Sequence, residues 1–368
     1  MMKKQTYIFV DVLRGLAATL VVVYHIAVLC KWNGIPEHGF LRIFRTGWIG
    51  VDMFFVISGF VISLSVLHGM ANGKSSVFFK TFVRHRLARI VPLYVLTSLV
   101  IAIFVDIHFW QLPSRWRLEN VGTHLFFIHN LFPAYAGALN GAAWSLGVEM
   151  QFYILIALLL PFWPRHRALS LALLGIVMSI LWRTFCWHHW QGNATMTMHA
   201  ASQIIGCLNA FFMGAALALI TYNRGHFLHA YMQPGARNAG LWLLAATLCG
   251  TAAWHIFWPR AGYWHLAGMV IGWRTLLTLA FTLYLVCAIT LPENKYTVLA
   301  FIPALYLGKI SYGIYLWHLP VITSLMKMNL SAGRMAALTA LLTLLLAACS
   351  WHFFEKPLID TYRAKRAE

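Results

Sequence analysis

Ten apolar stretches, each long enough to cross a lipid bilayer as a helix, constrain the fold of this chain more than any other feature. Hydrophobic residues make up 60% of the sequence and charged residues only 10%, a composition far from that of a soluble globular protein. The sequence therefore predicts an all-α, polytopic transmembrane helical bundle of about ten spans. The predicted spans are 7–30, 47–68, 89–110, 143–163, 168–190, 203–222, 239–257, 264–291, 304–328 and 333–354.

The Lys and Arg residues between these spans predict the orientation of the bundle. With the N-terminus inside, sixteen of them fall in inner segments and eight in outer loops. Because positive charge accumulates on the cytoplasmic side of membrane proteins, we expect both termini in the cytoplasm. The same rule explains the net charge of +18 without a nucleic-acid partner. Membrane lipids are the expected surroundings.

The first span carries two residues that are costly in a membrane, Arg14 and His25. They are eleven residues apart, which on a helix brings them back to within about 20° of one face, roughly 16 Å apart along the axis. One interpretation is that they line a polar tunnel. The other is that Arg14 snorkels to the interface while His25 only hydrogen-bonds a neighbouring helix.

A basic layer is predicted near the inner surface. Arg84, Arg86 and Arg89 would stand with Arg14 at the inner mouth of the third span, where Pro92 falls in the first helical turn. Arginines at helical spacing can hold phosphate groups. The simpler explanation of the cluster is ordinary cytoplasmic positive charge.

A second polar layer is predicted toward the outer surface. Asp52 and Glu149 each fall about one turn inside the start of a span, and His25 and His318 approach the same depth on spans that run outward. Carboxylates and imidazoles inside apolar helices are expensive unless they meet, so we expect contact between them. A polar cluster with a purely structural role is the alternative.

This layout suits acyl transfer. A sugar hydroxyl needs a base near pH 7, which His25 can supply, and a carboxylate such as Glu149 or Asp52 can fix the tautomer of the imidazole. General-base help is worth about 10² to 10⁴ in rate. The basic layer would hold the phosphates of a cytoplasmic acyl-CoA, whose pantetheine arm would carry the thioester toward His25.

The assembled motifs resemble those of the acyltransferase-3 family of bacterial inner-membrane O-acyltransferases. The matching features are Arg14 and His25 separated by ten residues, GVDMFFVISG at 50–59, RLARIVPLY at 86–94, WSLGVEMQFY at 144–153, SYGIYLWH at 311–318 and FFEKP at 353–357. The resemblance covers nearly the whole chain. It implies a multi-pass protein of the bacterial inner membrane that takes an acyl group, most often from acetyl-CoA, and places it on a cell-surface or lipid-linked carbohydrate.

The resemblance also implies that His25 is the catalytic histidine, with Arg14 as its motif partner and Glu149 and Asp52 as further polar motif residues. Arg86 and Arg89 are similar to the basic motif of the family. From the residues themselves we expect Glu149 and Asp52 to assist His25 in catalysis, and Arg14, Arg84, Arg86 and Arg89 to bind the donor. His318, Tyr315 and Trp144 are expected to bind substrate, with core packing as the alternative for Tyr315. We expect residues 1–368 to form a single membrane-embedded acyltransferase domain without the C-terminal SGNH hydrolase-like domain that some members carry.

A metal site and a transporter are the other possibilities that these residues raise. A metal site is not expected, because the spacing of the loop histidines His188, His189 and His199 matches no zinc pattern. A transporter or flippase for a glycan or small anion is the alternative to an enzyme, since such carriers also contain buried His and Glu residues. The absence of a visible repeat between the two halves of the sequence argues against it.

The two predicted layers lead to different kinetic effects. We expect Arg14→Ala to raise the KM for acyl-CoA, and Glu149→Gln to lower turnover more than donor affinity. Steady-state kinetics with varied acyl-CoA would separate the two effects. Unchanged donor affinity in Arg14→Ala would contradict the assignment of the inner layer.

Overall fold

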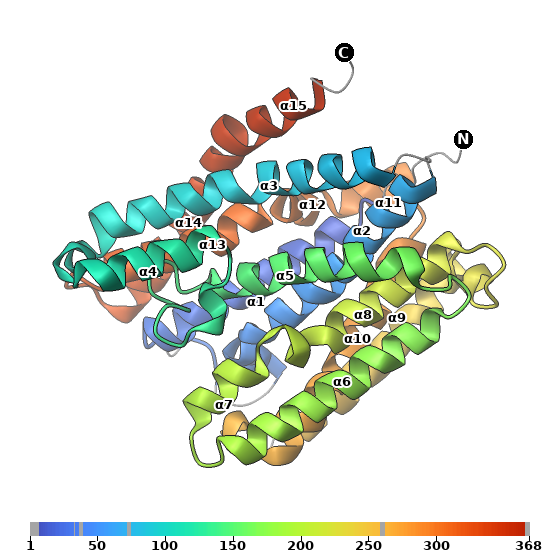
Figure 1. Cartoon of the computed structure of the whole chain (residues 1–368), viewed down its shortest axis with the longest axis horizontal. Helices are drawn as coiled ribbons and strands as arrows, with labels where there is room; N and C mark the ends of the chain where they lie inside the picture. Colours follow the sequence, from blue (N-terminus) through green and yellow to red (C-terminus); the bar gives the residue numbers. More distant parts are fainter. Residues whose placement is uncertain (1–6, 33, 37–39, 72–74, 258–261, 365–368) are drawn as a thin grey trace. The chain divides into compact units, whose positions relative to one another are not determined.

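The computed structural model describes residues 7–32, 34–36, 40–71, 75–257 and 262–364, and all regular secondary structure in these ranges is helical (Figure 1). This confirms the predicted all-α fold. The α-helices are α1 (Val10–Leu29), α2 (Gly50–Ala71), α3 (Ser75–Val100), α4 (Ser114–Leu125), α5 (Trp144–Leu159), α6 (Ala168–His189), α7 (Ala194–Ala201), α8 (Ile204–Tyr222), α9 (Ala236–Phe257), α10 (Arg274–Thr290), α11 (Lys295–Ala300), α12 (Ile302–Lys309), α13 (Ser311–Leu325), α14 (Ala332–Ser350) and α15 (Lys356–Ala364).

Nine helices of the described residues are long and apolar enough to cross a membrane, one fewer than the sequence predicted. The difference lies at the predicted span 304–328, which is divided into α12 and α13 at Ile310. Ile310 has φ −93° and ψ 5°, outside the α-helical values, and the Ser311 hydroxyl donates to the Gly308 carbonyl at 2.8 Å. The break leaves α13 with 15 residues, short of a full crossing.

The orientation of the bundle stays a prediction. Of the basic residues counted for it, six lie outside the described residues: Lys3, Lys4, Lys74, Arg260, Lys365 and Arg366.

The third predicted span begins earlier than expected. Helix α3 starts at Ser75 and continues through a π-helical turn, Ile101–Val105. Pro92 therefore lies in the interior of α3 and not in its first turn. A proline inside a transmembrane helix is tolerated because neighbouring groups can satisfy the carbonyl that it leaves free.

The described helices form two compact units. Unit 1 consists of Met1–Leu13, Asp52–Ser75 and Val148–Leu305. Unit 2 consists of Arg14–Val51, Ser76–Gly147 and Tyr306–Glu368. We describe each unit by itself.

Helix α8 is the core of unit 1. It packs against α6 and α10 (Figure 1), and every residue from Gly206 to Ile220 is buried. Small residues allow this close approach: a Cβ atom at Gly214 would meet the Val56 carbonyl of α2, and one at Gly59 would meet the Phe211 carbonyl of α8. Packing of small residues is the usual way in which transmembrane helices associate, because lipid supplies no hydrophobic driving force between them.

Helix α13 connects the parts of unit 2. It packs against α14 and is hydrogen-bonded to α3, where the Tyr312 hydroxyl donates to the Ile90 carbonyl at 2.7 Å. The segment before α5 is held as well, because the Asn140 amide donates to the Leu316 carbonyl at 3.1 Å. Three segments far apart in the sequence are therefore attached to one helix.

The packing of α8 predicts opposite effects of one substitution at two glycines. Gly214→Ala should destabilise the protein by about 1 to 3 kcal/mol, because the added methyl group meets backbone atoms of α2 that cannot rotate away. Gly240→Ala is the matched control, since its Cβ on α9 would meet nothing within 4 Å. That change should stabilise α9 by up to about 1 kcal/mol. Thermal unfolding in detergent would measure both effects. An unfolding temperature of Gly214→Ala equal to that of the wild type would contradict the close approach of α2 and α8.

Candidate active site

The two histidines predicted to lie at one depth, His25 and His318, contact each other in unit 2. The Nδ1 atom of His25 lies 3.2 Å from the Nε2 atom of His318, and the ring centroids are 4.9 Å apart. His25 is half-buried on α1, whereas His318 on α13 is fully buried. The sequence predicted contact between buried polar residues at this depth, and for these two residues it is confirmed.

The hydrogen bonds around this pair determine which nitrogen atoms carry protons. His318 Nδ1 lies 2.7 Å from the Tyr315 carbonyl, which can only accept, so this nitrogen is protonated and Nε2 of the neutral ring is an acceptor. His25 Nδ1 lies 2.9 Å from the Val21 carbonyl as well as near His318 Nε2. Because both neighbours are acceptors, His25 carries its proton on Nδ1, which leaves the lone pair of Nε2 available as a base.

The beginning of α13 is fixed to the segment that leads into α5. The Tyr315 hydroxyl donates to the Ala142 carbonyl at 2.8 Å and lies 2.8 Å from the Ser145 hydroxyl. Trp144, the first residue of α5, is half-buried in the same segment. Of the three predicted substrate-binding residues, His318 contacts His25 and Tyr315 holds this segment in place.

Glu149 of unit 1 has hydroxyl groups as its partners. Its Oε1 atom accepts hydrogen bonds from Ser58 of α2 and from Tyr153, the latter at 2.6 Å. Tyr153 is one helical turn further along α5, so the sequence spacing alone could have suggested this contact. The contact with Ser58 links α5 to α2 and could not be read from the sequence.

Asp52 of unit 1 is paired with an arginine that had been given no role. Its Oδ1 atom accepts a hydrogen bond from Arg274 Nε of α10 at 2.8 Å, and both side chains are almost wholly buried. The second carboxylate oxygen, Oδ2, has no hydrogen-bond partner among the residues that the structure describes. A lone Asp in one span and a lone Arg in another were the signal for this pair, because two buried charges need each other.

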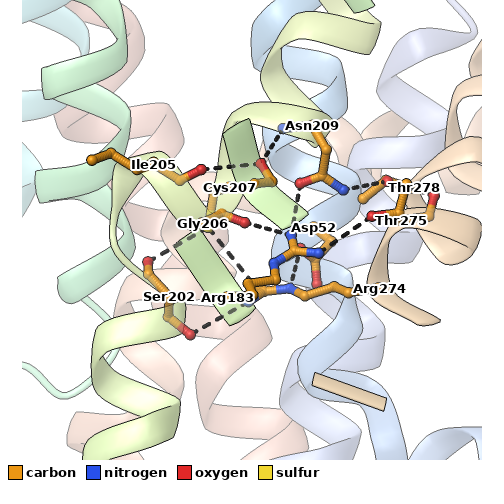
Figure 2. A network of polar contacts seen from close by, with 11 residues as sticks. Asp52, Arg183, Ser202, Ile205, Gly206, Cys207, Asn209, Arg274, Thr275 and Thr278 are labelled. Carbon is orange, nitrogen blue, oxygen red and sulfur yellow. Dashed lines mark hydrogen bonds and ion pairs between the residues drawn. The ribbon is translucent and has the colours of Figure 1, made fainter. Parts of the chain in front are cut away.

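A second buried arginine, Arg183 of α6, lies beside this pair (Figure 2). It donates to the Gly206 carbonyl and, at 2.7 Å, to the side-chain oxygen of Asn209. The Asn209 amide in turn donates to Thr278 of α10 at 2.8 Å. Helices α2, α6, α8 and α10 thus contribute to one polar network, in which neutral oxygens bind the Arg183 guanidinium.

The predicted donor-binding arginines stand on two helices of unit 2. Arg14 lies on the same continuous helix as His25, as predicted, and is partly exposed. Arg84, Arg86 and Arg89 all lie on α3, where Arg84 is exposed and the guanidinium of Arg86 lies 5.7 Å from the centre of the Phe82 ring. Among the described residues, no group of three His, Cys, Asp or Glu residues could hold a metal ion.

Comparison with known proteins identifies the family. A family model described as an acyltransferase domain matches residues 7–353. This chain belongs to the acyltransferase-3 family. The predicted resemblance is therefore confirmed, and so is the prediction that the chain is an acyltransferase. No solved structure matches the acyltransferase-3 chain described here.

Curated relatives of this acyltransferase-3 chain include a protein of Komagataeibacter xylinus described as a membrane-bound transacylase, BcsY. It is 28% identical over 367 residues, which cover 95% of this chain and 82% of the relative. The peptidoglycan O-acetyltransferase OatA of Listeria monocytogenes is 25% identical over 372 residues. The O-acetyltransferase OatA of Staphylococcus aureus is 23% identical over 372 residues. This chain spans about half the length of the last two relatives, 55% and 56%.

The pairing of Asp52 with Arg274 predicts how substitutions of the two residues combine. Asp52→Asn should destabilise the protein by about 3 to 5 kcal/mol, because it leaves the Arg274 guanidinium buried without a counter-ion. The double variant Asp52→Asn/Arg274→Met should recover much of that loss, since it removes both charges. Thermal unfolding of the two variants in detergent is the measurement. A single variant as stable as the wild type would show that the ion pair does not hold the helices together.

Proposed function

We propose that this acyltransferase is an inner-membrane O-acetyltransferase that moves an acetyl group from cytoplasmic acetyl-CoA to a hydroxyl of a cell-surface or lipid-linked carbohydrate. The observation that carries the proposal is the His25–His318 pair, which leaves one imidazole nitrogen of His25 available as a base. The names of the relatives, two of which are O-acetyltransferases, support the chemistry. We also propose that the matched residues 7–353 act as a single acyltransferase domain.

His25 acts as the general base. Its Nε2 atom takes the proton of the acceptor hydroxyl while that oxygen attacks the carbonyl carbon of the thioester. The carbon–sulfur bond then breaks, and the proton on His25 passes to the leaving thiolate of CoA. The products are the acetyl ester and free CoA, and His25 returns to its neutral form.

His318 is the positioning residue for this base. Its Nε2 atom accepts from His25 Nδ1, so it holds the tautomer that the reaction needs and stabilises the imidazolium that forms. The sequence had given this role to a carboxylate, either Glu149 or Asp52. The neutral imidazole of His318 can perform the same task, and its burial costs less than that of a carboxylate.

The two carboxylates keep separate proposed roles. Glu149 is held by the Ser58 and Tyr153 hydroxyls and stays a proposed catalytic residue whose loss lowers turnover. Asp52 is the counter-ion of Arg274, and we propose that it affects the reaction only through the fold of unit 1.

The arginines of unit 2 are the proposed donor site. Arg14, Arg84, Arg86 and Arg89 carry permanent positive charge, which suits the phosphates of acyl-CoA. The helix that carries Arg14 also carries His25, about 16 Å further along its axis. An extended pantetheine arm is the part of the donor that can cover such a distance.

The role of the histidine pair predicts graded losses of activity. His25→Ala should lower acetyl transfer by about 10² to 10⁴, because the base is lost. His318→Phe should lower kcat by about 10-fold to 100-fold with an unchanged KM for acetyl-CoA, because the ring remains but the acceptor nitrogen does not. Labelled acetyl-CoA supplied to inverted membrane vesicles, with label followed into the glycan fraction, measures both variants at equal expression.

His68→Phe is the matched control for these variants. His68 lies on α2 and bonds the carbonyl four residues back, that of Leu64, at 2.7 Å, as His25 bonds Val21. Its substitution should leave transfer unchanged. Equal transfer by wild type and His25→Ala would refute His25 as the base. Accumulation of a glycan without acetylated product would favour the transporter alternative.

A further inference from the structure

A second cluster of unit 2 has its polar members in the segment between α3 and α5, outside the nine candidate membrane spans of the described residues. Asn120 and His124 of α4 and His129 of the following turn are its polar members, and Tyr94 of α3 and Phe127 supply aromatic rings. Asn120 and His129 are fully buried, and His124 is 3% exposed. We call these five residues the connector cluster.

The two histidines of the connector cluster are stacked. Their ring centroids are 4.1 Å apart and the ring planes differ by 13°. The turn between them contains Phe127 at φ 55°, in the left-handed region that is strained for an aromatic residue. Tyr94 stacks on Phe127 with centroids 4.9 Å apart. Strained backbone of this kind is found preferentially at ligand-binding sites.

Each stacked histidine presents an unprotonated nitrogen. His129 Nε2 donates to the Ala143 carbonyl at 3.1 Å, which leaves Nδ1 bare. His124 Nδ1 donates to the Asn120 carbonyl at 2.9 Å, which leaves Nε2 bare. Burial lowers the pKa of both rings, that of His129 to about 4 with a contribution from His124, so both are neutral near pH 7.

Four buried polar atoms of the connector cluster have no hydrogen-bond partner among the described residues. They are the bare nitrogens of His124 and His129 and both atoms of the Asn120 side-chain amide. Native proteins rarely leave buried polar groups unsatisfied, because each lost hydrogen bond is a cost to stability. Four such atoms at one place indicate that a bound molecule supplies their hydrogen bonds.

The chemistry of these atoms restricts what can bind. A metal ion would have to lie in the plane of each imidazole, and two nearly parallel stacked planes cannot share one ion. Anions are repelled by the bare lone pairs, and a buried cation would have no carboxylate within the cluster. A neutral hydroxyl fits, because it can donate to an imidazole nitrogen and accept from the Asn120 amide.

The connector cluster is joined to the helix that carries His318. His129 donates to the Ala143 carbonyl, and Tyr315 of α13 donates to the carbonyl of the preceding residue, Ala142. Two adjacent carbonyl groups of one segment therefore connect the stacked histidines with α13. A ligand that moved His129 would therefore also affect the segment that positions α13.

We propose that the connector cluster binds hydroxyl groups of the acceptor carbohydrate. The proposal rests on the proposed function, in which a carbohydrate is the acceptor. Asn120, His124 and His129 bind the hydroxyls, and the aromatic rings contact the apolar face of the sugar ring. Because the polar atoms are enclosed, the turn 126–131 has to shift to admit the ligand, and that shift releases the strain at Phe127.

Asn120→Leu is the decisive variant, because the Asn120 side-chain amide has no hydrogen-bond partner among the described residues. The substitution therefore breaks no hydrogen bond of the fold. The probes are the tetramers of glucose and of N-acetylglucosamine, added to the purified full chain in lipid nanodiscs. We expect saturation-transfer NMR to show that at least one tetramer binds the wild type. The same tetramer should bind Asn120→Leu and His124→Phe at least 10-fold more weakly. In transfer assays the KM for the probe should rise by the same factor, with kcat and the KM for acetyl-CoA unchanged.

Glu119→Gln is the matched control on the same helix. Its side chain is 44% exposed and bonds Arg115 and Tyr135 at the surface, so it should bind the probes as the wild type does. The proposal is overturned if neither tetramer binds the wild type. It is also overturned if Asn120→Leu binds like the wild type and unfolds at a higher temperature, because the amide is then merely unsatisfied or holds water. Binding without acetyl transfer would refute the proposed function and still support this site.

Discussion

The ion pair between Asp52 and Arg274 shows the constraint on which the rest of the structure depends. A charge inside an apolar helix is costly, so each one must find a partner within the protein. In unit 1 that requirement links four helices, because Arg183 takes neutral oxygens of α8 and α10 while Asp52 and Arg274 join α2 to α10 (Figure 2). The small residues of α8 make this possible, since they let the backbones approach closely enough for short side chains to meet.

The same constraint has a different outcome at the histidine pair of unit 2, where both partners are neutral imidazoles. His25 and His318 satisfy each other and the carbonyls of their own helices, and this arrangement leaves a single basic nitrogen on the half-buried His25. A neutral partner suits a base better than a buried carboxylate, because no second charge has to be taken out of water. The proposed chemistry therefore follows from how the helices satisfy their polar groups.

The segment 140–145 holds two parts of unit 2 in place. Asn140, Ala142 and Ser145 hold the beginning of α13 through Leu316 and Tyr315, and Ala143 holds His129. A short stretch before α5 thus fixes the helix of His318 and the turn of the stacked histidines at once. Family membership accounts for an acyltransferase, whereas this local arrangement is where we expect the acceptor to be recognised.

The sequence by itself determined the helical class and most of the spans, because hydropathy and helical spacing act over neighbouring residues, and its motifs indicated the family by resemblance. It also placed Arg14 and His25 on one helix and indicated which buried residues needed partners. Only the tertiary structure decided which residues those partners are. His25 and His318 are 293 residues apart in the chain, and Asp52 and Arg274 are 222 apart. The cost of desolvation requires a buried polar group to be paired, but helix packing determines the partner, and in unit 2 it made His318 a neighbour of the proposed base.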